Sequence, residues 1–139
     1  MIVGFTGTKR GMNSLQQQKV YDYFEESHPT EFHHGVCVGA DEQAHRIANE
    51  VFGISIIGHP PINLKYVAPL HVSGFLCILE NKEYLKRNHD IVDACDVLLA
   101  TPGELAEQLR SGTWATIRYA RKMKKPIVII RPDGEYVYE

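Results

Sequence analysis

The chain has 139 residues, which is enough for one domain whose core buries most of its apolar surface. Hydrophobic residues make up 44% of the sequence and charged residues 23%, values that are typical of globular proteins and exclude a disordered or fibrous chain. The formal net charge of −2 argues against a protein whose main task is to wrap nucleic acid or to coat an anionic membrane, although it leaves room for a local basic groove.

The sequence lacks the signals of membrane insertion, disulfide bonding and metal binding. No apolar run is long enough to cross a bilayer, and no charged leader with a cleavage site precedes the first apolar run, so we predict a cytoplasmic protein without a membrane partner. Cys37, Cys77 and Cys95 are odd in number and widely spaced, and we expect them to be reduced and mostly buried. Only His33 and His34 are adjacent histidines, and neighbours in a strand face opposite sides, so we predict no metal site.

The N-terminal part of the chain predicts a strand, a loop and a helix. The apolar run at residues 2–5 indicates a strand, and residues 6–11 form a loop rich in glycine, hydroxyl groups and cations. Asn13 or Ser14 can cap the helix that follows, which we expect to run to about Ser27.

Alternation of strand and helix continues through the middle of the chain. We predict a weak strand at residues 31–34, an amphipathic helix over 41–52 and a third strand at 55–58. Residues 62–79 have no clean period and predict an irregular excursion of the kind that forms binding loops or lids, with a short strand or helical turn in 72–79.

The C-terminal part repeats the same pattern. A polar helix is predicted at residues 80–94, a buried strand at 97–100 and a second helix at 113–124. The continuous apolar run at 127–130 is typical of a strand that is covered on both faces, and a short edge strand is possible at 136–138.

This order of elements predicts an α/β fold with a single domain. Short apolar strands that alternate with helices imply parallel βαβ units with right-handed crossovers, in a Rossmann-like three-layer sandwich. We expect a mostly parallel sheet of five strands, or slightly more, with helices on both faces. If the strand order is 3-2-1-4-5, the first and fourth strands are neighbours at the point where the order reverses, which is where such sheets bind ligands.

Two polar stretches would then meet at that point. Glycines and cations after the first strand suit a phosphate, and the start of the last helix offers unpaired N–H groups and a partial positive charge. A mobile surface turn and an ordinary helix cap are the structural alternatives for the two stretches. The hypothesis requires Lys9 and Arg110 to lie at the same rim of the sheet. The residues that would take the phosphates are Gly7, Thr8, Lys9, Arg10, Arg110, Ser111, Gly112 and Thr113.

Further residues are candidates for other contacts to the ligand. Gly39 and Asp41 begin the second helix, where an acid is favourable for the helix dipole alone. Asp41 and Asn88 are candidates to hold ribose hydroxyls or to order the neighbouring loops. Trp114 is the only tryptophan, and it either stacks on a base or packs in the core.

The sequence resembles the SMF/DprA/LOG (SLOG) superfamily of Rossmann-like proteins. Three stretches carry the resemblance: the glycine-rich loop after the first strand, GADEQAH at 39–45, which is similar to a G-x-D-x-x-A-H segment of the DNA-processing A proteins, and RSGT at 110–113. With Arg87-Asn88 and residues 93–96 the match spans almost the whole chain apart from 62–79. The resemblance implies the fold more strongly than a function, because the superfamily includes nucleotide sensors, DNA-binding recombination mediators and enzymes that cut N-glycosidic bonds.

One departure from the superfamily's enzymes is informative. The Lonely Guy phosphoribohydrolases carry G-G-x-G-T-x-x-E, whereas here Thr116 stands where the glutamate is expected. A threonine cannot replace that carboxylate without another activating group. Glu104 and Glu107 in the preceding loop are the weak candidates for a catalytic role.

We therefore predict a nucleotide-binding protein, with a nucleotide as the small-molecule ligand and no certain cofactor. The alternatives are an N-glycosidic-bond hydrolase or deoxyribosyltransferase-like enzyme and, least favoured, a protein that binds single-stranded DNA. Superfamily members often pair, but no apolar helical stripe here requires a partner, so the sequence leaves a homo-oligomer open. The base and the number of phosphates are equally open.

Overall fold

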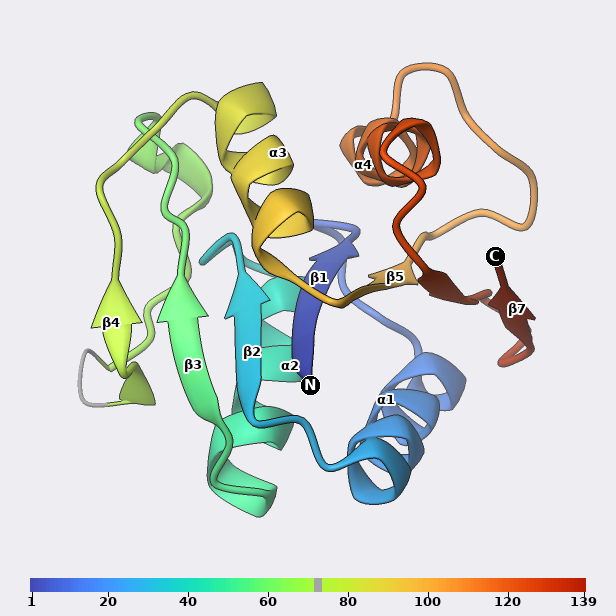
Figure 1. Ribbon diagram of the computed structural model, residues 1–139, viewed down its shortest axis with the longest axis horizontal. Helices are drawn as coiled ribbons and strands as arrows, with labels where there is room; N and C mark the ends of the chain where they lie inside the picture. The colour runs from blue at the N-terminus through green and yellow to red at the C-terminus, as the bar shows by residue number, and fades with distance from the viewer. Residues whose placement is uncertain (72–73) are drawn as a thin grey trace.

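A seven-stranded, mostly parallel sheet organises the molecule. The computed structural model describes residues 1–71 and 74–139 (Figure 1). Within these residues no helix is both long and apolar enough to span a lipid bilayer. The strands are β1 (Ile2–Gly7), β2 (Glu31–His34), β3 (Ser55–Gly58), β4 (Cys77–Ile78), β5 (Val97–Thr101), β6 (Ile127–Ile130) and β7 (Tyr136–Tyr138). The helices are α1 (Ser14–Ser27), α2 (Ala40–Arg46), the π-helix η1 (Ile47–Val51), the 3-10 helix η2 (Leu64–Tyr66), α3 (Tyr84–Ala94) and α4 (Gly112–Lys122).

The strand order is β4-β3-β2-β1-β5-β6-β7. The five strands predicted from the sequence have the predicted order, and β4 and β7 extend the sheet at its two edges. Strand β1 lies between β2 and β5 with parallel register, so Val3 is beside Phe32 on one side and Val97 on the other. Only β7 is antiparallel among the described strands. The loops after β1 and β5 therefore leave the same edge of the sheet.

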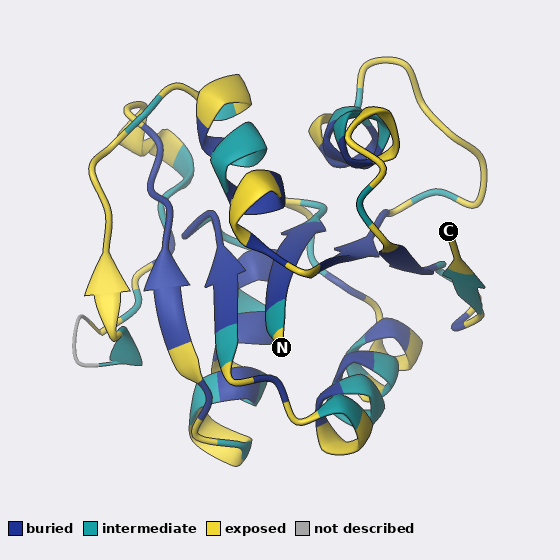
Figure 2. Cartoon of the chain, in the orientation of Figure 1, coloured by how far each residue is buried: buried dark blue, intermediate teal, exposed yellow. Residues whose placement is uncertain are grey.

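Helices cover both faces of the sheet, as the Rossmann-like prediction requires. Helices α1 and α2 lie on one face and α3 and α4 on the other (Figure 1). Successive residues of a strand supply the two cores: Leu99 packs with Phe5 and Phe24 on the α1 side, whereas Leu98 packs with Ile117 on the α4 side. Most residues of β1, β2, β3, β5 and β6 are buried, whereas the edge strands β4 and β7 are more exposed (Figure 2). Burial on both faces explains the continuous apolar sequences of β5 and β6.

Helix caps explain where two of the helices begin. The side chain of Asn13 accepts the N–H of Gln16, while the Gln16 side chain accepts the N–H of Asn13, so a reciprocal capping box starts α1. The hydroxyl of Ser111 accepts the N–H of Trp114 at the start of α4. Asn13 was one of the two predicted caps of α1, and a helix cap was the structural alternative to an anion site at the start of α4; both caps are present.

Several predicted boundaries were wrong. Helix α3 starts at Tyr84 rather than residue 80, because the segment before it is extended and Pro61 bridges with Lys82. The predicted helix 41–52 is divided into α2 and the π-helix η1. Strand β1 extends to Gly7, so the first two residues of the predicted loop belong to the strand. In the 62–79 excursion the structure has η2 and β4, and the part of that prediction at 72–73 lies outside the described residues.

The adjacent histidines of β2 form two separate buried pairs. His33 Nδ1 lies 2.8 Å from Nε2 of His59, and His34 Nε2 lies 2.8 Å from Nδ1 of His45. The N–H of Val36 donates to Nδ1 of His34, so neutral His34 carries its proton on Nε2 and donates it to His45. In the described part of the chain no group of three or more His, Cys, Asp or Glu residues is placed to hold a metal ion.

We expect these pairs to make the protein less stable as the pH falls from 6.5 to 4. Burial lowers the pKa of His34 well below its usual value and that of His59 to about 4, so below pH 6.5 the unfolded chain binds protons that the folded chain does not. Burial also lowers the pKa of His45. Asp41 acts in the opposite direction, because burial raises its pKa to about 6, and offsets only part of the loss.

Urea denaturation at pH 7, 6, 5 and 4.5 measures this effect. In His59→Gln the amide nitrogen can replace Nε2 without titrating, so the slope of stability against pH should decrease by up to one proton, about 1.4 kcal/mol per pH unit. An unchanged slope in the variant would contradict the assignment of His59.

Candidate functional site

A large cleft lies where the carboxyl ends of β1, β2 and β5 meet the N-terminal half of α3 and the start of α4. It has a volume of about 940 Å³. Lys9 and Arg110 both line it, so the two cation-bearing stretches lie at the same rim of the sheet, which was the geometric condition of the prediction. The predicted site residues that line the cleft are Gly7, Thr8, Lys9, Arg10, Asp41, Asn88, Glu104, Glu107, Arg110, Ser111, Gly112 and Thr113.

Two predicted residues lie outside this lining. Trp114 is 5% exposed and packs with Leu98 and Ile117 in the core beneath α4, so of the two alternatives for this residue the structure has the packed one. Gly39 lies behind the loop after β1, where the N–H of Ala40 donates to the carbonyl of Thr8 at 3.0 Å. Its contribution is to the shape of that loop, because its hydrogen faces the backbone of Thr8 and Lys9.

The cations of the cleft differ in how they are compensated. Lys9 Nζ lies 4.1 Å from the centre of the Tyr66 ring, in a cation–π contact. Arg10 forms an ion pair with Glu104 at 2.8 Å. Arg110 is exposed and forms no ion pair with any described residue. Among the exposed cations of the cleft, Lys9 and Arg110 are therefore those that an anion would meet without a competing carboxylate from a described residue.

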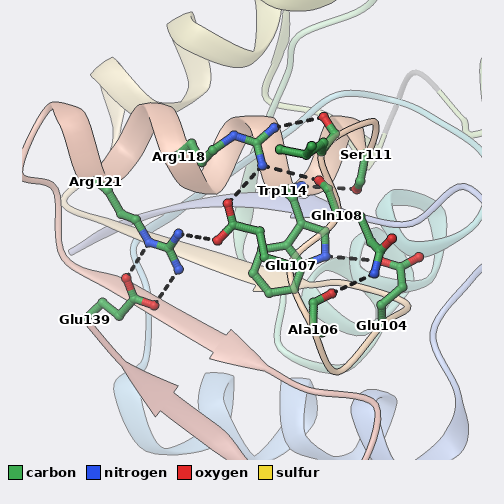
Figure 3. Close-up of polar contacts among 10 residues, drawn as sticks. Glu104, Ala106, Glu107, Gln108, Ser111, Trp114, Arg118, Arg121 and Glu139 are labelled. Atoms are coloured by element: carbon green, nitrogen blue, oxygen red, sulfur yellow. Dashed lines mark hydrogen bonds and ion pairs between the residues drawn. The ribbon is translucent and has the colours of Figure 1, made fainter.

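The loop between β5 and α4 is tied to the body of the protein by ion pairs (Figure 3). The two carboxylate oxygens of Glu107 accept from Arg118 at 3.0 Å and Arg121 at 2.7 Å, and Arg121 also binds Glu139. Arg118 donates to the carbonyl of Leu109 as well. The hydrogen bonds from Arg121 and Arg118 hold the pKa of Glu107 below its usual value. Glu107 is therefore ionised and is not suited to donate a proton at neutral pH.

A tight turn of residues 35–37 forms the floor of the cleft after β2. Oδ2 of Asp41 accepts the N–H groups of Gly35 and Cys37, at 3.1 and 3.2 Å. Burial raises the pKa of Asp41 to about 6, while nearby Arg87 and the two N–H groups act to lower it. Val36, between Gly35 and Cys37, has a left-handed φ of 57°, which is an uncommon conformation for a β-branched residue. Of the two roles considered for Asp41, these contacts correspond to the second, which is to order the neighbouring loop.

Arg87 also lines the cleft, where no role was predicted for it from the sequence. Its guanidinium is buried and donates to the carbonyls of Gly35 at 2.6 Å and His59 at 3.2 Å, and to Oδ1 of Asn88 at 2.7 Å. It therefore joins the ends of β2 and β3 to α3. The available signal was its place on a helix near the switch point, next to Asn88, but an arginine on a polar helix is usually solvated.

Apolar residues at the mouth of the cleft were also not predicted. Leu85 and Leu109 line it and are 65% and 88% exposed, and Cys37 and Tyr84 line it as well. Exposed leucines at a cleft are compatible with a ligand that has an apolar or aromatic part besides its charge. In the sequence Leu85 was read as part of a helix and Leu109 lay in a polar loop, so neither stood out.

Comparison with known proteins finds similarity at the level of structure. No family model and no curated protein matches the sequence. The molybdenum cofactor binding protein from Rippkaea orientalis matches with a TM-score of 0.70 and 20% identity, over 94% of this chain and 76% of that one. The Moco carrier protein from Chlamydomonas reinhardtii matches with a TM-score of 0.67 and 21% identity, over 92% and 74%.

A third similar structure links the chain to the proteins whose motifs it resembles. The DNA processing protein A from Helicobacter pylori matches with a TM-score of 0.62 and 17% identity, and the match covers 93% of this chain and 64% of that one. At these identities the similarity concerns the fold. The chain thus has the Rossmann-like fold of these proteins, as the order of its predicted elements indicated.

Proposed function

We propose that the cleft binds a nucleotide or a closely related phosphate-bearing small molecule. The observation that supports this most directly is that Lys9 and Arg110, from loops about a hundred residues apart in sequence, line one cleft together with the start of α4. Phosphate binding of this kind uses backbone N–H groups, cations and a helix N-terminus together.

The start of α4 has the properties that such a site requires. Ser111 caps the N–H of Trp114, while the N–H groups of Gly112 and Thr113 have no hydrogen-bond partner among the described residues. A Cβ added at Gly112 would meet nothing within 4 Å, and the residue's φ is not left-handed. The fold therefore does not require glycine here, but a ligand that approaches the backbone closely would.

The rest of the ligand would extend along the floor of the cleft. Asp41 uses Oδ2 for the turn at 35–37, and its Oδ1 has no partner among the described residues, so it is available to accept from a hydroxyl or amine. Asn88 uses Oδ1 for Arg87, which leaves its amide nitrogen as a donor. Both residues are proposed as contacts to the sugar of a nucleotide.

The similar structures support a ligand-binding role without identifying the ligand. The Rippkaea and Chlamydomonas proteins bind or carry molybdenum cofactor, and the Helicobacter protein binds single-stranded DNA. An enzyme that cuts N-glycosidic bonds has less support, since Glu104 and Glu107 are held by Arg10, Arg118 and Arg121. Release of a free base in the assay below would favour it, and a gel shift with single-stranded DNA at low salt would favour the nucleic-acid alternative.

Gly112→Ala provides the test of the proposed site. The variant should unfold at the temperature of the wild type or up to about 4 °C above it, because the added methyl group has space and alanine favours the helix. In a melting-temperature assay with millimolar nucleoside mono-, di- and triphosphates, we expect at least one nucleotide to stabilise the wild type and to stabilise the variant less, with about a tenfold loss of affinity.

The matched control is Gly53→Ala, which lies in a turn far from the cleft along the chain and leaves the proposed site intact. Its ligand-induced shift should equal that of the wild type. Absence of a shift with every nucleotide would overturn the proposal, and so would an equal shift in wild type and Gly112→Ala.

A further inference from the structure

Three side chains form a connected chain across the rim of the cleft. Arg10, from the loop after β1, binds Oε2 of Glu104 at 2.8 Å, and the other oxygen of Glu104 accepts the indole N–H of Trp114 at 3.1 Å. Figure 3 shows Glu104 and Trp114 from the loop and from α4. Trp114 is 5% exposed, whereas the side chain of Arg10 is 75% exposed. Glu104 is thus anchored on the buried side, and Arg10 is its exposed partner.

Glu104 and Glu107, the two acids of the loop between β5 and α4, pair with arginines in different places. Both oxygens of Glu107 are used by Arg118 and Arg121, which lie on α4 and are not among the residues that line the cleft. Glu104, in contrast, pairs with Arg10, which belongs to the loop after β1 that is proposed to contact the phosphates. Asp41, the third acid of the cleft, forms no ion pair among the described residues.

We propose that Glu104 is an internal competitor for the anionic group of the ligand. Without ligand, Glu104 forms the ion pair with Arg10. When a phosphate binds, the guanidinium of Arg10 leaves the carboxylate and binds the phosphate oxygens. This inference rests on the proposed function and specifies how the site selects its ligand. An exposed ion pair contributes little to stability, so Arg10 is easily exchanged.

The competition sets the affinity that an anion needs in order to bind at Arg10. A phosphate group carries up to two negative charges and can bind the planar guanidinium through two oxygens, so it can displace a carboxylate that carries one charge. A monocarboxylate ligand gains no such advantage over Glu104. The site should therefore bind phosphates at concentrations at which carboxylates do not bind measurably, and removing the charge of Glu104 should raise the affinity for both.

Trp114 supplies a signal for the exchange. It is the only tryptophan of the chain, and its N–H contacts the carboxylate that loses its cation when Arg10 moves. Binding of an anion at Arg10 should therefore change the tryptophan fluorescence of the wild type. The amide oxygen of Glu104→Gln can still accept the indole N–H but carries no charge, so the anchor is kept and the competitor is lost.

The experiment titrates wild type, Glu104→Gln, Arg10→Gln and the double variant with inorganic pyrophosphate and with acetate, by calorimetry and tryptophan fluorescence at 0.15 M salt. We expect Glu104→Gln to bind pyrophosphate about three- to tenfold more tightly than the wild type, and the gain to disappear in the Arg10→Gln background. Acetate should bind detectably only when Glu104 is replaced.

Glu107→Gln is the matched control, because it removes the same charge from the same loop but from a different set of arginines. Its affinity for pyrophosphate should stay within about twofold of the wild type. An equal gain in Glu107→Gln, or no gain in Glu104→Gln, would overturn the role of Glu104 while leaving the proposed function intact. Absence of pyrophosphate binding in all variants, together with no nucleotide-induced stabilisation, would overturn both.

Discussion

Arg87→Met is expected to lower the free energy of unfolding by about 3–5 kcal/mol, as measured by urea denaturation at pH 7. Methionine can fill much of the space of the arginine stem but has no donor. The carbonyls of Gly35 and His59 accept from the guanidinium at 2.6 and 3.2 Å, and they would lose that donor in a buried setting. A buried acceptor without a partner costs about 1–3 kcal/mol.

The charge of Arg87 adds to this loss. Asp41 is buried, and Arg87 is the nearby cation that acts against the rise of its pKa. Without the guanidinium the Asp41 carboxylate would be more costly to keep ionised, and the turn that it holds through Gly35 and Cys37 would weaken. We therefore expect the two residues to be coupled: Arg87→Met combined with Asp41→Asn should cost less than the sum of the single variants.

Arg87→Lys is the matched control for charge. Lysine keeps the positive charge but cannot place three donors in the fixed geometry of a guanidinium. Arg87→Lys should therefore lower the free energy of unfolding measurably, but by less than Arg87→Met. A loss below 1 kcal/mol in Arg87→Met would show that water replaces the guanidinium and that the three contacts contribute little.

The sheet could be predicted because its signals are local. The strands at 31–34, 55–58 and 127–130 have their predicted bounds, since each is a short run of strand-forming residues with a polar or turn-forming segment on either side. Parallel strands joined by helices then allow few topologies, and one of these places the loops after β1 and β5 together. Most of the candidate site followed from this single step.

The rest depends on contacts between residues that are distant in sequence. Arg87 contacts the carbonyl of Gly35, 52 positions away, and Glu107 contacts Arg121 across a loop and a helix. Nothing in the local pattern distinguishes such an arginine from a solvated one. Trp114 illustrates the same point: its burial depends on packing beneath α4, and its N–H finds an acceptor in Glu104 only when the loop folds back.

Gly39→Ala should destabilise the protein by about 3 kcal/mol or more, for two reasons that act together. Gly39 has φ 86° and ψ −125°, a conformation that residues with a Cβ rarely adopt. A Cβ at this position would also lie 2.3 Å from the carbonyl oxygen of Lys9 and 2.8 Å from that of Thr8. Both oxygens belong to backbone, so the loop that carries the proposed phosphate contacts must move.

Gly53→Ala is the reference without a steric clash, since Gly53 also has a positive φ, of 62°, but a Cβ there would meet nothing within 4 Å. Its cost should be only about 1 kcal/mol, the conformational part alone. The difference between the two variants in urea denaturation therefore contains the close approach of α2 to the loop after β1, together with the extra conformational cost of φ 86° and ψ −125° at Gly39. Equal losses would mean that this loop yields freely, and a loop that yields freely could not hold Lys9 and Arg10 in a fixed position for an anion.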